Sequence, residues 1–276
     1  MQILDYKHIV ATERRDGYFA IPELERQKSS VKQFIELANL DIELIKPTGF
    51  IYVDGFTITQ AESGLGSTAG KYVVAVTGGS SYALHKWISS FKTPEYVVAA
   101  TITSGTCASG IQALMIAEEW LMLGVCEEVI VIGGERITED TLRLFKELRI
   151  DIMCGDGFVY MKFGKGMGNL ESINWKYAYN ANPFTFTSHS LNTLIPDYPL
   201  DFIKLHGTGT PSNTEAEADL AELGIPLTFK SRIGHTQGIS SLLEMCIVLS
   251  SDAIKGTILV LANGLGGFYG SCTLYK

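Results

Sequence analysis

The chain has 276 residues, of which 46% are hydrophobic, so it is long enough to fold as one large domain or two half-size lobes around a full core. Lys and Arg number 22 against 30 Asp and Glu, and the formal charge of −8 gives no electrostatic support for a nucleic-acid partner. No apolar run approaches the length that spans a bilayer and the N-terminus lacks the pattern of a secretory signal, so we expect a cytoplasmic protein with no membrane contact.

The first 45 residues are the least informative part, with helical spacing only over Val31–Ile45. From residue 49 onward, short apolar runs alternate with helical segments, which predicts a mixed sheet covered on both faces. The second half repeats the order of the first, which suggests an internal duplication. The expected strands are Gly49–Thr59, Lys71–Thr77, Glu95–Ile102, Glu128–Ile132, Phe158–Phe163, Ile173–Tyr179, Asp201–Leu205, Thr257–Leu261 and Ser271–Tyr275, and the expected helices are Tyr82–Phe91, Cys107–Leu123, Thr214–Leu223 and Ile239–Leu249.

Five cysteines, an odd number, include no Cys-x-x-Cys pair and do not cluster with histidine at zinc spacing. We therefore expect neither a disulfide framework nor a metal site, and the pattern suits a reducing compartment. The five are Cys107, Cys126, Cys154, Cys246 and Cys272.

Cys107 lies in a short turn between a predicted strand and a predicted helix. A cysteine where a helix begins is close to the positive end of the helix dipole and to unpaired N–H groups, both of which favour the thiolate. The position therefore indicates a nucleophile, although a free cysteine is often simply a small buried residue.

Two histidines lie in glycine-containing segments of the second half. His206 opens the segment His-Gly-Thr-Gly-Thr-Pro directly after a predicted strand, where open α/β sheets place their ligands. His235 ends the segment Lys-Ser-Arg-Ile-Gly-His, which begins at Lys230 and precedes an apolar helix carrying Glu244. Taken singly, each histidine could be a structural residue in a turn or a cap.

A glycine-rich segment, Asn-Gly-Leu-Gly-Gly-Phe, follows at 263–268 and by itself is typical of a hairpin. The cysteine, the two histidine segments and this loop, in this order, resemble the active-site motifs of the β-ketoacyl-acyl-carrier-protein synthases of the thiolase superfamily. The resemblance covers roughly residues 71–276. It implies an α/β thiolase-like fold with duplicated halves in a layered αβαβα arrangement, residues 1–165 carrying the nucleophile and residues 166–276 carrying both histidines.

The resemblance also implies an activity: decarboxylative Claisen condensation of an acyl thioester with malonyl-acyl carrier protein, as in fatty-acid or polyketide synthesis. Cys107 would accept the acyl group. His206 and His235, as Nε2–H donors, would stabilise the enolate that forms when the malonyl group loses CO₂. Lys230 and Glu244 would order water and set the charge state around His235.

The glycine-rich loop would complete the site. The resemblance implies that the backbone N–H groups of Cys107 and Leu265 form the oxyanion hole, within a loop that includes Gly264, Gly266 and Gly267. It implies neither a metal nor a resident cofactor, because the acyl groups arrive on the phosphopantetheine of a carrier protein or on coenzyme A.

The expected partners follow from the same resemblance. An acidic acyl carrier protein could contact a basic stripe of Arg143, Lys146 and Arg149, although such stripes are usually solvated faces. Family members dimerise through the strand before the cysteine, here Glu95–Ile102, which carries a run of uncharged residues. The dimer could be homomeric or formed with a longer synthase.

The sequence departs from the family in its shorter length, in Thr214 where an Asp often follows the first histidine, and in Leu265 where a gating Phe is usual. Two alternatives stay open. One is a non-catalytic, chain-length-factor type of partner subunit, which the short length favours. The other is a non-decarboxylating thiolase, which needs a second cysteine as acid and base; Cys272 is near the C-terminal loop but in a predicted strand.

Overall fold

The computed structural model describes residues 1–276 apart from 26–29, 54–82, 104, 148–149, 181 and 183–184. Its first sheet has five strands in the order β1-β8-β6-β4-β5. β8 pairs antiparallel with β1 and with β6, whereas β4 pairs parallel with β6 and with β5. Parallel neighbours need crossover connections, which the alternating strands and helices of the sequence predict. The strands are β1 (Gln2–Val10), β4 (Thr48–Val53), β5 (Val97–Thr103), β6 (Glu128–Glu135) and β8 (Gly157–Gly164).

The second sheet repeats this plan. Its order is β9-β13-β12-β10-β11, again with antiparallel pairs on the β9 side and parallel pairs on the β11 side. The duplication expected from the order of elements is therefore visible in the pairing of the strands. These strands are β9 (Leu170–Tyr177), β10 (Phe202–Lys204), β11 (Ile225–Leu227), β12 (Thr257–Gly264) and β13 (Phe268–Tyr275).

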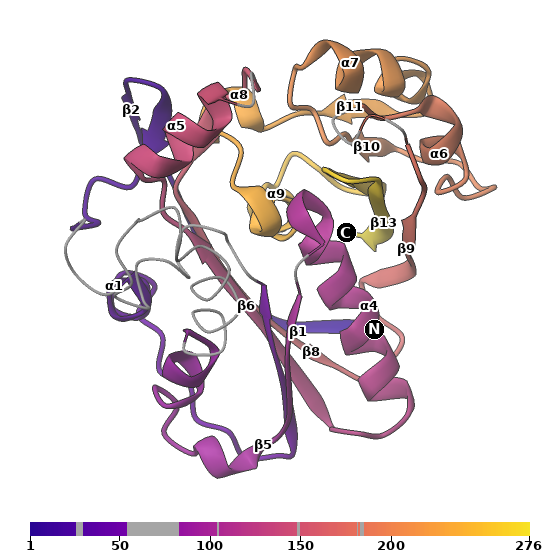
Figure 1. The fold of residues 1–276 in the computed structure, drawn as a ribbon. Coiled ribbons are helices and arrows are strands. Elements are labelled where there is room, and N and C mark those ends of the chain that lie inside the picture. Colours follow the sequence, from indigo (N-terminus) through magenta and orange to yellow (C-terminus); the bar gives the residue numbers. More distant parts are fainter. Residues whose placement is uncertain (26–29, 54–82, 104, 148–149, 181, 183–184) are drawn as a thin grey trace.

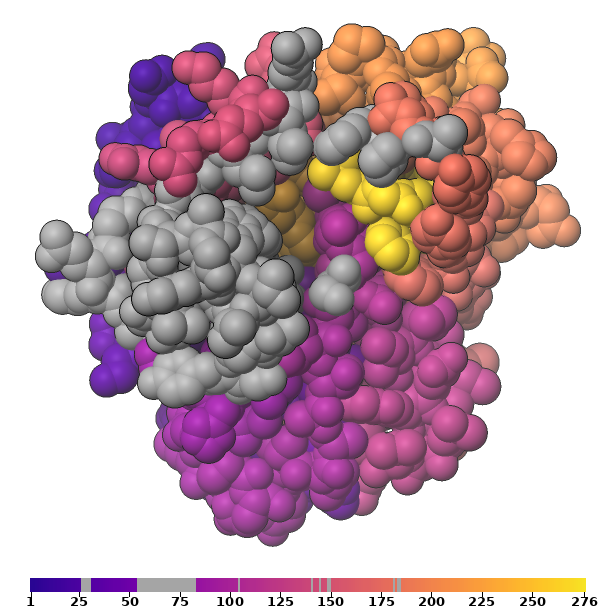
Figure 2. Space-filling model, in the orientation of Figure 1, coloured from indigo at the N-terminus to yellow at the C-terminus, as the bar shows by residue number. Residues whose placement is uncertain are grey.

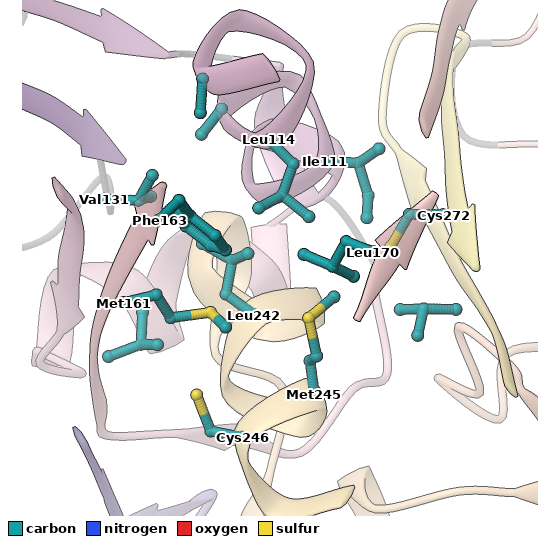
Figure 3. Close-up of a cluster of buried hydrophobic side chains, with 14 of the residues drawn as sticks. Ile111, Leu114, Val131, Met161, Phe163, Leu170, Leu242, Met245, Cys246 and Cys272 are labelled. Carbon is teal, nitrogen blue, oxygen red and sulfur yellow. The ribbon is translucent and has the colours of Figure 1, made fainter. Parts of the chain in front are cut away.

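Two apolar helices lie between the sheets and contact each other, α4 (Ser109–Met122) and α9 (Ser240–Ser250) (Figure 1). Most residues of α9 are buried, whereas α4 is buried on one broad face and exposed near its C-terminal end, where Met122 is 70% exposed. Figure 3 shows this core, where Leu114 of α4 and Leu242 of α9 face Phe163 of the first sheet and Leu170 of the second.

Shorter helices cover the outer faces. Phe34 of α1 (Ser30–Leu37) and Trp87, in a helix over residues 83–88, stack on Phe158 of the first sheet. On the second sheet, α6 (Ser188–Asn192) and α7 (Pro211–Glu217) bury side chains against Tyr269. The layers are therefore α, β, α, β, α, as in the expected thiolase-like fold.

Several expectations about individual elements need correction. The first 20 residues form β1 and a hairpin of β2 (Glu13–Arg15) and β3 (Tyr18–Ala20), which pairs with β7 (Cys154–Gly155). β1 lies at the edge of its sheet and is half-exposed, so its sequence has no continuous apolar run.

Two expected helices differ from the observed ones, and two short helices complete the fold. The helix over Val31–Ile45 ends at Leu37, and Thr214–Leu223 is divided between α7 and a 3₁₀ turn, Asp219–Glu222. The expected strand Lys71–Thr77 and the second half of Gly49–Thr59 lie outside the described residues. The remaining helices are α5 (Glu139–Glu147) and α8 (Lys230–Ile233).

Within the described ranges, no helix combines the length and the apolar character needed to cross a membrane.

Candidate active site

Cys107 lies in a 3₁₀ turn, Thr106–Ala108, between the end of β5 and the start of α4. Thr106 has φ of 51°, an uncommon left-handed conformation for a residue with a β-branched side chain, which marks a tightly constrained turn. The turn packs against β12 at Gly264, where an added Cβ would come within 2.3 Å of Thr106 Oγ1. Only glycine permits this approach, which brings the C-terminal loop beside Cys107. Figure 2 views this side, with the yellow C-terminal residues against the magenta chain at the start of α4.

The two histidines meet at the cysteine. Nε2 of His235 lies 3.0 Å from Cys107 Sγ, and the ring centroids of His206 and His235 are 5.3 Å apart, edge to face. All three side chains are at least nine-tenths buried. His206 follows β10 and His235 follows α8, so the second sheet and its connections deliver both rings to a nucleophile held by the first.

Backbone N–H groups also reach the sulfur. The backbone N–H groups of Leu265 and Cys107 act on Cys107 Sγ so as to lower its pKa, as expected of donors that can hold a developing oxyanion. Burial outweighs these donors and the charge of Lys230 and raises the pKa of Cys107 to about 11. The sequence-based expectation that the turn favours the thiolate is thus overridden by desolvation, and the resting group is a thiol.

Glu244, fully buried on α9, is held between two buried lysines. Its Oε2 lies 2.5 Å from Nζ of Lys204, and its Oε1 lies 2.7 Å from Nζ of Lys230. Lys204 also donates to the carbonyl of Leu261 at 2.9 Å, and Lys230 donates to the carbonyl of His206. The two cations hold the pKa of Glu244 below its usual range despite burial. When all three are ionised the cluster carries one net positive charge.

Ser240 connects this cluster to the catalytic candidates. Its Oγ lies 3.1 Å from Glu244 Oε1 and 3.4 Å from Nδ1 of His235. A hydroxyl can donate one hydrogen bond and still accept others. Ser240 can therefore hydrogen-bond to either tautomer of His235. It can accept from Nδ1–H while it donates to Glu244, or it can donate to an unprotonated Nδ1.

Both histidines are neutral in this setting. Burial first, and then the charge of Lys230, lowers the pKa of His206 and of His235 well below the usual value, and Lys204 adds to the effect. A neutral ring keeps one nitrogen as a donor and one as an acceptor, which general acid–base work needs.

Glu217 of α7 orders the segment that carries His206. Its carboxylate accepts hydrogen bonds from the backbone N–H groups of His206 at 2.5 Å and Gly207 at 3.0 Å. Asn213 Oδ1 accepts from the N–H of Thr208 at 3.0 Å, one step further along. The segment is therefore a structured support for His206 rather than a plain turn.

A cavity of about 440 Å³ opens onto Cys107, His206 and His235. Its floor is buried, and its mouth carries partly exposed hydroxyl residues of the second half, such as Thr208 and Thr210. Apolar side chains on the walls are Phe145, Ile150, Ile152, Phe186 and Leu265. A molecule that enters the cavity would pass these hydroxyl residues before it meets Cys107 and the two histidines.

Several functional candidates were missed from the sequence. Lys204 could have been found from the sequence, because it is a charged residue inside an apolar run that predicts a buried strand. Nothing in the sequence points to Gln237. Its Oε1 lies 4.0 Å from Cys107 Sγ, and its Nε2 lies 3.9 Å from Cys154 Sγ. Cys154 is therefore nearer the site than expected, whereas Cys272 is buried in the core between the sheets.

The structure also describes the cysteines and two of the three basic residues that the sequence singled out. All five cysteines are free thiols. Arg143 and Lys146 lie on α5, whereas Arg149 falls outside the described residues. No group of three His, Cys, Asp or Glu side chains in the described part of the chain is arranged to hold a metal ion.

Comparison with known proteins gives a likeness in structure alone. No family model and no curated protein matches the sequence. Among solved structures, the complex of a type II polyketide acyl-carrier protein with its hexaketide-bound ketosynthase, AntDE:AntF, superposes with a TM-score of 0.69 at 13% identity, covering 100% of this chain and 98% of that one.

Two further ketosynthases are similar. The ishigamide ketosynthase/chain length factor has a TM-score of 0.65 at 13% identity, over 94% of this chain and 88% of that one. The oxazolomycin ketosynthase domain OzmH KS7 of Streptomyces albus JA3453 has a TM-score of 0.65 at 14% identity, over 84% of this chain; the chain spans only 55% of that domain. This chain therefore has the thiolase-like fold of the ketosynthases.

Proposed function

We propose that the chain is a condensing enzyme of the β-ketoacyl synthase type. It would transfer an acyl group from a thioester to Cys107 and then join that group to a malonyl unit carried on an acyl carrier protein. The observation that carries the proposal is the convergence of Cys107, His206 and His235 on one cavity, with His235 Nε2 3.0 Å from the sulfur.

In the first half-reaction the thiol of Cys107 passes its proton to Nε2 of His235 and attacks the thioester carbonyl. This step requires the tautomer with hydrogen on Nδ1, which Ser240 can accept while it donates to Glu244. The oxyanion is held by the N–H groups of Cys107 and Leu265. The carbon–sulfur bond of the donor then breaks, and its thiol leaves with the proton from His235.

In the second half-reaction the malonyl thioester loses CO₂, and the electron pair of the broken carbon–carbon bond becomes an enolate. His206 and His235 would stabilise the enolate oxygen with Nε2–H donors; His235 first exchanges its Nδ1 proton for one on Nε2 through solvent, and Ser240 supports this tautomer by donating to Nδ1. The enolate carbon attacks the acyl group, the bond from that group to the sulfur breaks, and Cys107 leaves as its thiolate, which a proton from solvent returns to the resting thiol. The cationic Lys204–Glu244–Lys230 cluster favours the negative charge at this stage.

The partners follow from this chemistry. An acyl carrier protein is the proposed donor, and AntDE:AntF is a neighbour described with such a carrier bound. The cavity is next to α5, because Phe145 of this helix lines it. Arg143 and Lys146 are on the same helix. We expect charge reversal at Arg143 and Lys146 to weaken turnover with the acidic carrier and to leave a small pantetheine thioester unaffected.

Intact mass spectrometry tests the function directly. The purified chain is incubated with a panel of acyl thioesters and then with malonyl-carrier protein, and Cys107→Ala is treated in parallel. We expect an acyl adduct on the native chain alone, discharged as a product longer by two carbons. A folded native chain that takes no acyl group from any donor would sink independent catalysis.

A second candidate is a non-catalytic partner subunit of a synthase heterodimer. The chain's 55% coverage of the OzmH KS7 domain and its likeness to a ketosynthase/chain length factor favour it. The intact cysteine and histidine set argues against it, because a silent subunit does not need these residues. The same mass measurement, repeated after adding a full-length synthase, separates the two.

A further inference from the structure

Asn263 carries a side-chain amide that is fully buried at the catalytic cavity and unpaired. It lies near the end of β12 and lines the cavity together with Cys107, His206 and His235. Neither Oδ1 nor Nδ2 finds a hydrogen-bond partner among the described residues. Leaving a buried polar group unsatisfied costs about 1–3 kcal/mol, so an amide that faces a cavity in this state calls for a polar group on the bound molecule.

The depth of Asn263 shows which part of the substrate it meets. Asn263 has 0% exposure and His235 1%, whereas the threonines at the mouth are partly exposed. Asn263 is also two residues before Leu265, whose N–H contacts the Cys107 sulfur. The amide therefore lies beside the reacting carbons, and the carrier arm passes the mouth instead.

The chemistry of the amide narrows the ligand further. An amide offers both a donor and an acceptor. A saturated acyl chain satisfies neither atom. A hydroxyl pairs with both atoms and a keto oxygen pairs with Nδ2, so an oxygen a few bonds from the thioester carbonyl suits this position.

We infer that Asn263 selects acyl groups bearing an oxygen on the third carbon, as 3-hydroxyacyl or 3-oxoacyl thioesters, over saturated ones. This inference rests on the proposed function, since it places the acyl group of a thioester at Cys107. It assigns a specificity-determining residue in a chain segment where only Leu265 and the glycines were expected to act.

The first arm of the test is acylation. Rates of Cys107 acylation are measured with butyryl-, 3-hydroxybutyryl- and acetoacetyl-pantetheine for the native chain, Asn263→Leu and Asn263→Ala. We expect the native chain to prefer the oxygenated donors by about tenfold in kcat/KM. Both variants should lose that preference, because their rates with the two oxygenated donors fall relative to their butyryl rate.

Ser241→Ala is the matched control. Ser241 is also buried with an unpaired side-chain oxygen, but it packs against Gly110 of α4 and does not line the cavity. Its replacement should leave the preference unchanged. An equal loss across the three donors in the Asn263 variants would overturn the inference and assign the residue a structural or arm-binding role.

The second arm is binding, measured by calorimetry on Cys107→Ala with and without Asn263→Leu, which needs no turnover. The same preference of about tenfold is expected, and it should vanish with Asn263→Leu. Discrimination in binding without acylation of the native chain would uphold the role of Asn263 and defeat the proposed function. Acylation without discrimination would overturn the role of Asn263 and leave the proposed function standing, and binding without discrimination would also overturn that role. If ordered water alone pairs with the Asn263 amide, neither arm should discriminate between the donors, and the inference is likewise overturned.

Discussion

The two halves of the molecule place different residues at the same point of the same topology. In the first half the chain leaves the parallel strand β5, passes Cys107 and enters α4; in the second it leaves β11, passes His235 and enters α9. Because α4 and α9 pack against each other between the sheets, their starts meet. One half thus supplies the proposed nucleophile and the other its proposed proton acceptor.

The helices also differ one turn further on. Four residues after its first serine, α4 has Ala113, buried among apolar side chains, and α9 has Glu244, buried between Lys204 and Lys230. The Lys204–Glu244–Lys230 cluster therefore belongs to the second half. The first half contributes a different buried charge, the carboxylate of Glu135 on β6, which adds to the rise in the pKa of Cys107 after burial.

The largest expected effect breaks that asymmetry. Glu244→Leu makes α9 resemble α4 but leaves two buried lysines without their carboxylate, so we expect a loss of about 3–5 kcal/mol in the free energy of unfolding, measured by urea denaturation. A triple variant, Lys204→Met, Lys230→Met and Glu244→Leu, should recover most of the stability while remaining inactive. A cost below about 1 kcal/mol for the single variant would contradict the role assigned to Glu244.

The next effect concerns the edges of the sheets. β5 ends the first sheet with seven residues, and Val98 on it is 54% exposed, whereas β11 has three residues, one of them Pro226. A strand edge of that length favours pairing with another copy, and proline on an edge opposes it. If the chain dimerises through β5, we expect Val98→Lys to weaken the dimer about 100-fold, measured by light scattering.

Ile225→Lys on β11, also at an exposed position, is the control and should leave association unchanged. A dimer indifferent to Val98→Lys would refute pairing through β5. A native chain that is monomeric alone and associates with a longer synthase would favour the heterodimer.

A smaller effect tests the connection between the two halves. Ser240→Ala removes the partner of His235 Nδ1, and we expect about a tenfold loss in the acylation rate of Cys107 near neutral pH. The loss should narrow as the pH rises toward the Cys107 pKa of about 11, because the thiol then ionises without His235. Ser240→Thr should restore the rate, and Ser241→Ala should not change it. A loss independent of pH would indicate a merely structural serine.

The smallest effect is on stability in acid. The pKa values of His206 and His235 lie well below the unfolded value, so the unfolded chain binds more protons as the pH falls below about 6.5. The free energy of unfolding should therefore decrease between about pH 7 and pH 5. His206→Gln with His235→Gln should reduce this slope. Part of it should persist, since burial also lowers the pKa of His8 on β1.

Much of the fold and the centre of the site could be predicted because their signals are local. Apolar runs predicted the strands of both sheets except β1 and β11, which were not expected. The motifs around Cys107, His206 and His235 indicated residues that the structure brings together. β1 was missed because an edge strand needs no continuous apolar run, and the β2–β3 hairpin because its strands have three residues each.

The sequence by itself determined the alternation of elements, the glycine at 264 that lets two segments approach, and the cysteine and histidines that are the candidate catalytic residues. Each of these depends on side chains or backbone freedom along a short stretch. Only the tertiary structure decided the pairing of Lys204 with Glu244, the position of Ser240 beside His235, and the unpaired amide of Asn263 at the cavity. These depend on burial and on contacts between β10, α9 and β12, which are distant in sequence. Burial also raised the pKa of Cys107 against the local effect of its turn, because desolvation is a property of the whole fold.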